Sequence, residues 1–125
     1  MKPDTEDAKL LVSLAQWGTA LGLDEAVSAL WRNDFDPEAG SVSDRHVRCV
    51  LQFGETIGTL VKNELLNRDL VLDWLWVAGM WGRVGPAAVK ERERHGEPRL
   101  YENFEALATW PDRQETTVSA RGAIE

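Results

Sequence analysis

Residues 70–81 read LVLDWLWVAGMW, and this stretch decides how the chain can fold. Ten of its twelve residues are apolar, three of the chain's six tryptophans lie in it, and Asp73 is its only charged residue. The run is longer than a typical strand and shorter than the roughly 20 apolar residues that a membrane span requires. It therefore predicts a buried helix. Asp69 is the expected N-cap, because a short oxygen-bearing side chain accepts a hydrogen bond from the first turn.

Both faces of this predicted helix are apolar. One face would carry Leu70, Trp74, Val77, Ala78 and Trp81. A helix that is hydrophobic all round must be covered all round. The second cover is either the chain's own helices or another copy of the chain. On the latter interpretation, the opposite side of the helix is an interaction surface that includes Leu72, Leu75, Trp76 and Met80.

Hydrophobic periodicity predicts further helices on both sides of this stretch. We expect helices over residues 5–21, 24–32, 43–67, 86–95 and 100–108, with a kink or short break at residues 82–85. Asp24 is the expected N-cap of the second helix. Gly54 and Gly58 share one face of the third helix, which predicts close backbone contact with the tryptophan-rich helix.

These elements predict an all-α fold, a small helical bundle with short flanking helices. Because residues 67–68 form only a tight link, the helices over residues 43–67 and 69–81 should form a long antiparallel hairpin. We expect a single helical domain over residues 1–110. Residues 111–125 are polar and patternless, which predicts a disordered C-terminal tail.

The charge balance argues against several classes of partner. The chain has 21 acidic and 14 basic residues, a net charge of −7, so we expect no binding to nucleic acid or to an anionic membrane. Cys49 is the only cysteine, which excludes an intrachain disulfide and fits a reducing cytoplasm. The polar N-terminal residues do not resemble a signal peptide. We therefore expect a soluble cytoplasmic protein.

Two stretches together resemble a known family. The first reads FGETIGTLVK over residues 53–62, followed by ELL at 64–66 and DLV at 69–71. The second reads ERERHGEPRLYENFEALA over residues 91–108, and PRLYENF at 98–104 is its most specific part. In order and spacing they resemble the DUF4760 family of small, mostly helical bacterial proteins of unknown function. The resemblance implies a helical fold and supplies no catalytic residues. Many relatives carry a transmembrane helix before this region, whereas this chain has amphipathic helices there.

Residues that could carry chemistry are few. His46 and Cys49 could share a helix face, but a metal site needs more ligands, and no phosphate-binding loop or nucleophile signature is present, so we expect no cofactor. Asp73 is expected in the first turn of its helix, partly in water. The alternative is a polar clamp or pocket in which Asp73 pairs with Arg99, joined by Tyr101 and Asn103.

The sequence favours a noncatalytic interaction or regulatory protein. It would self-associate, for example as a homodimer, or bind a protein partner through its tryptophan-rich helix surface, since aromatic residues contribute much of the energy at interfaces. A different class is a small-molecule-binding protein or an enzyme with a pocket between helices, polarised by the clamp residues. A third is an acidic mimic of nucleic acid.

Overall fold

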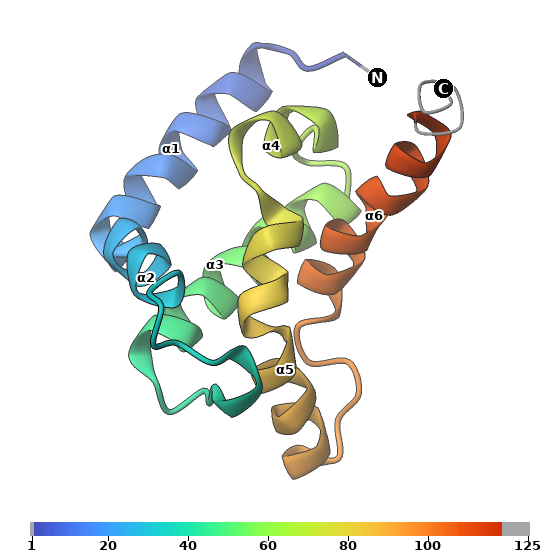
Figure 1. Ribbon diagram of the computed structural model, residues 1–125. Helices are drawn as coiled ribbons and strands as arrows, with labels where there is room; N and C mark the ends of the chain where they lie inside the picture. Colours follow the sequence, from blue (N-terminus) through green and yellow to red (C-terminus); the bar gives the residue numbers. More distant parts are fainter. Residues whose placement is uncertain (1, 119–125) are drawn as a thin grey trace.

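The structure, a computed structural model, describes residues 2–118, with side chains as far as Trp110. Within these residues the fold is all-α, with helices joined by short links and no strand, as the periodicity predicts (Figure 1). The elements are α1 (Thr5–Leu21), α2 (Leu23–Leu30), the 3₁₀ turn η1 (Pro37–Ala39), α3 (Arg45–Lys62), α4 (Arg68–Trp74), α5 (Val77–His95) and α6 (Glu102–Val118).

The first two helices are set by local capping signals. Asp4 and Asp7 form a reciprocal capping box at the start of α1. Gly22 ends α1 in the left-handed conformation, with φ 78°, which a glycine adopts without steric penalty. The same glycine is the N-cap of α2, so the prediction that Asp24 caps this helix is wrong.

Residues 70–81 are not one helix, and this is the main correction to the prediction. Asn67, not Asp69, caps α4 by accepting a hydrogen bond from the Leu70 backbone N–H at 2.9 Å. The helix ends at Trp74, Leu75 is extended, and α5 begins at Val77. The change of direction lets both apolar segments reach the core, because Val71 and Val77 are both buried. A single straight helix would have left one apolar face uncovered.

The third helix also ends earlier than predicted. It stops at Lys62, and Glu64 turns the chain with φ 61° while the Leu65 N–H donates to the Leu60 carbonyl. Beyond the helix end, Leu65 is 63% exposed and Leu66 is buried. The long antiparallel hairpin over residues 43–81 is therefore not confirmed.

Helix α5 runs without interruption through residues 82–85, where a break was expected, and Pro86 lies inside it. A proline in a helix removes one backbone hydrogen bond. Burial explains why the helix continues, because Val84, Gly85, Ala87 and Ala88 all face the core.

Helices α3 and α5 contribute the largest shares of the buried core. Helix α3 packs against α2, α5 and α6, and α5 also packs against α6 and η1. Figure 1 shows α1 and α2 on one side of α5 and α6 on the other. Helix α6 extends beyond its predicted end at residue 108, into the region predicted as a tail from residue 111. The rest of that predicted tail, residues 119–125, lies outside the described residues. No described helix is long and apolar enough to cross a membrane.

Candidate functional site

The exposed tryptophans gather at a groove between α2 and the link from α4 to α5. We call it the tryptophan groove. Its volume is about 520 Å³, and it is lined by Leu23, Asp24, Val27, Ser28, Trp31, Trp74, Leu75, Trp76 and Met80. Trp76 lies on the link itself and is 69% exposed, and Trp31 at the end of α2 is 38% exposed. The non-helical link at Leu75 thus places the Trp76 indole on the surface.

The indole of Trp76 is held in place although it is exposed. It lies against the backbone at Gly79, where an added Cβ would collide with the ring. Its other neighbour is the Trp31 ring, with centroids 5.9 Å apart and planes tilted by 36°. Aromatic pairs at this separation attract each other beyond simple burial. The pair therefore forms a pre-ordered apolar surface.

Arg83 of α5 continues this row of rings. Its guanidinium carbon lies 5.5 Å from the Trp31 centroid and 5.3 Å from the Phe35 centroid, within the range of a cation–π contact. Its Nε donates a hydrogen bond to the Leu30 carbonyl at 2.8 Å, which satisfies a carbonyl at the end of α2. Arg83 thus contacts both the Trp31 ring and the backbone at the end of α2.

The four residues predicted as an interaction surface take different places. Trp76 is exposed, and Leu75 is half-buried in the groove. Met80 lines the groove but is only 6% exposed. Leu72 is half-buried and packs against the core. The surface predicted from the sequence does not include Trp31, although its position at the end of α2 favours exposure.

The predicted polar clamp around Asp73 does not form. Asp73 is exposed in the last turn of α4, not in the first turn of a helix, and makes no ion pair within the described residues. Arg99 is exposed and pairs with Glu102 at 3.3 Å. The error follows from the break at Leu75, which changes the position of Asp73 within its helix.

Asn103 instead meets Glu55 of α3, a residue that the sequence analysis did not single out. The Glu55 carboxylate accepts hydrogen bonds from the backbone N–H of Asn103 at 3.0 Å and of Phe104 at 2.9 Å. It also accepts one from the Asn103 side-chain amide at 3.0 Å. A carboxylate at the first turn of a helix accepts hydrogen bonds from the free N–H groups, and its charge is stabilised by the positive end of the helix dipole. Glu55 therefore anchors the start of α6.

The close contact predicted at Gly54 and Gly58 exists, but the neighbour is α6 and not the tryptophan-rich segment. An added Cβ at Gly54 would strike the Phe104 ring, and one at Gly58 would strike the Asn103 backbone. Phe104 itself is fully buried and packs edge-on to Trp81 with centroids 5.1 Å apart. The residues that carry the family resemblance, in FGETIG and ENF, thus meet at one helix contact.

Two half-buried groups, the Cys49 thiol and the Tyr101 hydroxyl, have raised pKa values. Burial raises the pKa of the Cys49 thiol, whose Sγ lies 3.6 Å from the Leu21 carbonyl oxygen. Burial, with the charges of Glu91 and Glu55, raises the pKa of Tyr101. Both shifts favour the protonated forms, which are poor nucleophiles and bases. Among the described residues, no three His, Cys, Asp or Glu side chains are placed to hold a metal ion.

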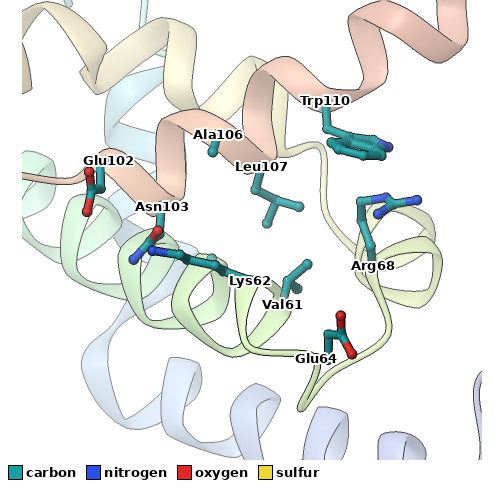
Figure 2. Close-up of a pocket in the computed structure, with 10 residues that line it drawn as sticks. Val61, Lys62, Glu64, Arg68, Glu102, Asn103, Ala106, Leu107 and Trp110 are labelled. Carbon is teal, nitrogen blue, oxygen red and sulfur yellow. The ribbon is translucent and has the colours of Figure 1, made fainter. Parts of the chain in front are cut away.

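A second cavity lies between α3, the start of α4 and α6, and we call it the α3–α6 pocket. Its volume is about 480 Å³. It is lined by Gly58, Val61, Lys62, Glu64, Arg68, Glu102, Asn103, Ala106, Leu107 and Trp110 (Figure 2). The Arg68 guanidinium carbon lies 4.0 Å from the centroid of a Trp110 ring, a close cation–π stack.

Comparison with known proteins identifies the family of the chain but no biochemical function. No curated protein and no solved structure shows significant similarity to this chain. The family model described as a domain of unknown function, DUF4760, matches residues 6–110, which include α1 to α5 and the start of α6. The match covers most of the chain, and the chain belongs to the DUF4760 family.

Proposed function

We propose that the chain is a noncatalytic interaction domain that docks a partner protein in the tryptophan groove. The observation that carries the proposal is Trp76, a large apolar side chain that is 69% exposed and yet held by Gly79 and Trp31. A pre-ordered aromatic side chain loses little conformational freedom on binding. Tryptophan is also among the residues most enriched at the energetic centres of interfaces.

The charges around the groove favour a basic partner over a second copy of the chain. Arg83, which contacts the Trp31 ring, is half-buried and lies outside the lining. Asp24 is the only charged residue in the lining, and Asp73 directly precedes Trp74 in the sequence. Both are exposed, and neither forms an ion pair within the described residues. A second copy would bring the same carboxylates and the same net charge of −7. A segment with an apolar anchor and flanking Lys or Arg complements both the indoles and the carboxylates.

The test compares two matched surface variants. Trp76→Ala removes the anchor, and Val12→Ala truncates an apolar side chain on α1 that is also exposed, at 55%. Proteins from a native lysate that bind the wild type and Val12→Ala, but not Trp76→Ala, are identified, purified and measured by calorimetry. We expect Trp76→Ala to weaken binding by about 30-fold or more, the loss typical of an interface hot spot.

A basic partner has a second signature. The double change Asp24→Asn and Asp73→Asn should weaken binding and reduce its dependence on salt, because screened charges contribute mainly at low ionic strength. The proposal is wrong if no purified protein distinguishes Trp76→Ala from Val12→Ala. It is also wrong if sedimentation shows a wild-type dimer that Trp76→Ala dissociates, since the groove would then be a self-association surface.

A further inference from the structure

We propose that the α3–α6 pocket is a binding site for a small organic anion with an apolar body. This site lies apart from the tryptophan groove, and none of its lining residues is shared with that groove. Its volume of about 480 Å³ falls in the range of about 300–1,000 Å³ that is usual for small-molecule sites.

The pocket offers apolar walls from two helices. Val61 lies on α3 and Leu107 on α6, and Figure 2 shows their side chains directed into the space between the helices. Ala106 and Trp110 extend the apolar surface along α6. Such walls suit the hydrocarbon or aromatic body of a ligand, and polar groups at the rim would fix its orientation.

The unpaired charges of the pocket are mainly positive. Neither Lys62 nor Arg68 forms an ion pair with a side chain among residues 2–110. The carboxylate of Glu102 is already bound by Arg99 at 3.3 Å. Glu64 is therefore the one remaining acidic side chain in the lining without an ion pair in the described part of the chain. In a chain with a net charge of −7, two such cations at one cavity favour an anionic ligand.

Arg68 is also held ready for such a contact. The stack on Trp110 fixes the plane of its guanidinium without neutralising its charge. Its Nε is covered by the protein and has no hydrogen-bond partner among the described residues, so a ligand would meet the terminal nitrogens. A planar guanidinium with terminal donors matches the two oxygens of a carboxylate.

Naphthalene-2-carboxylate is a suitable probe, because it combines an aromatic body with one carboxylate. Its neutral control is naphthalene-2-carboxamide, which has nearly the same shape. Binding is followed by the indole N–H resonances in ¹⁵N-labelled protein, with Trp110 assigned from Trp110→Phe. We expect saturable shifts of the Trp110 resonance, and weaker binding of the carboxamide by at least about tenfold, as expected when a charge-assisted hydrogen bond is lost.

Variants of the charged residues test the electrostatic part. Arg68→Gln and Lys62→Gln should each weaken binding of the carboxylate and leave the carboxamide nearly unchanged. Lys62 is exposed, so its variant tests the proposal even if Arg68→Gln perturbs the fold. Glu64→Gln should tighten binding, because it removes a like charge. Arg94→Gln, a matched change at a cation remote from the pocket lining, should have no effect.

Three results would overturn the proposal. The carboxylate and the carboxamide could bind equally, which would make the site a plain apolar surface. The probe could shift the resonances of Trp31 and Trp76 and not that of Trp110. Finally, Glu64→Gln could weaken binding, which would assign the pocket to a cationic ligand.

Discussion

Removal of the Glu55 side chain should detach the start of α6 from α3. In the structure the carboxylate accepts three hydrogen bonds from α6, two from backbone N–H groups of its first turn and one from the Asn103 side-chain amide. Loss of a helix cap destabilises a protein by about 0.5–2 kcal/mol, and each buried donor left without a partner costs about 1–3 kcal/mol. Because Glu55 is only half-buried, water can replace part of this loss. We therefore expect Glu55→Ala to lower the free energy of unfolding by about 2–4 kcal/mol.

Urea unfolding, followed by circular dichroism and tryptophan fluorescence, measures the effect. With a slope of about 1.5 kcal/mol per molar urea, the midpoint should fall by roughly 1–3 M. Glu55→Gln keeps one acceptor oxygen but loses the charge, and charge-assisted hydrogen bonds are roughly twice as strong as neutral ones, so it should lie between the wild type and Glu55→Ala. Glu93→Ala is the control, because Glu93 is exposed on α5 and its side chain makes no ion pair among the described residues.

Amide hydrogen exchange shows whether the loss of stability in Glu55→Ala arises at the start of α6. Exchange of the Asn103 and Phe104 N–H groups should accelerate in Glu55→Ala, and exchange in α1 should change only as far as global stability does. The reasoning is refuted if Glu55→Ala destabilises the protein no more than Glu93→Ala. It is refuted equally if the variant is destabilised while these two amides keep their wild-type protection relative to the rest of the chain.

Three further predictions follow from single positions. Gly58→Ala should destabilise the protein by about 1–3 kcal/mol, because the added Cβ collides with the α6 backbone. Gly82→Ala should stabilise it by up to about 1 kcal/mol, because the added Cβ lies in open space on a helix. Urea unfolding measures both variants, and a change of the same sign in their free energies of unfolding would contradict the prediction. Cys49 should react with a thiol reagent more slowly than in the unfolded chain at pH 8, because burial raises its pKa; equal rates would exclude this. Hydrogen bonds from the backbone N–H groups of Asp4 and Asn67 lower the pKa of Asp7 in the folded protein. The ionised Asp7 therefore stabilises the fold fully above the pKa that it has in the unfolded chain, and this stabilisation is lost as the pH falls through its folded pKa. The stability gap between wild type and Asp7→Asn should therefore shrink between about pH 5 and pH 3, and a constant gap in urea unfolding would contradict this.

The parts of the fold that could be predicted depend on neighbours in sequence. The first helix was expected over residues 5–21 and has these bounds, because Asp4 binds a backbone N–H group of its first turn and Gly22 ends it by its own backbone conformation. These signals act within three or four residues, so a pattern in the sequence contains them completely.

The parts that were missed depend on tertiary burial. No glycine or proline marks the link at Leu75, and the chain bends there because both flanking segments bury their apolar residues. Pro86 is the opposite case, a local breaker that the burial of its neighbours overrides. Glu55 caps a helix that begins almost 50 residues later, which no local pattern can indicate.

The place of the family resemblance in the fold bears on where function is sought. Gly54, Glu55 and Gly58 lie on α3, and Asn103 and Phe104 lie on α6; together they form the contact that fixes these two helices to each other. Each of these residues has a structural task, namely close approach, capping or core packing, and these tasks require no ligand. Trp76 at the tryptophan groove and the two cations of the α3–α6 pocket, Lys62 and Arg68, take no part in this contact. Substitutions at Trp76, Lys62 or Arg68 therefore test the two proposed sites without disturbing the contact between α3 and α6.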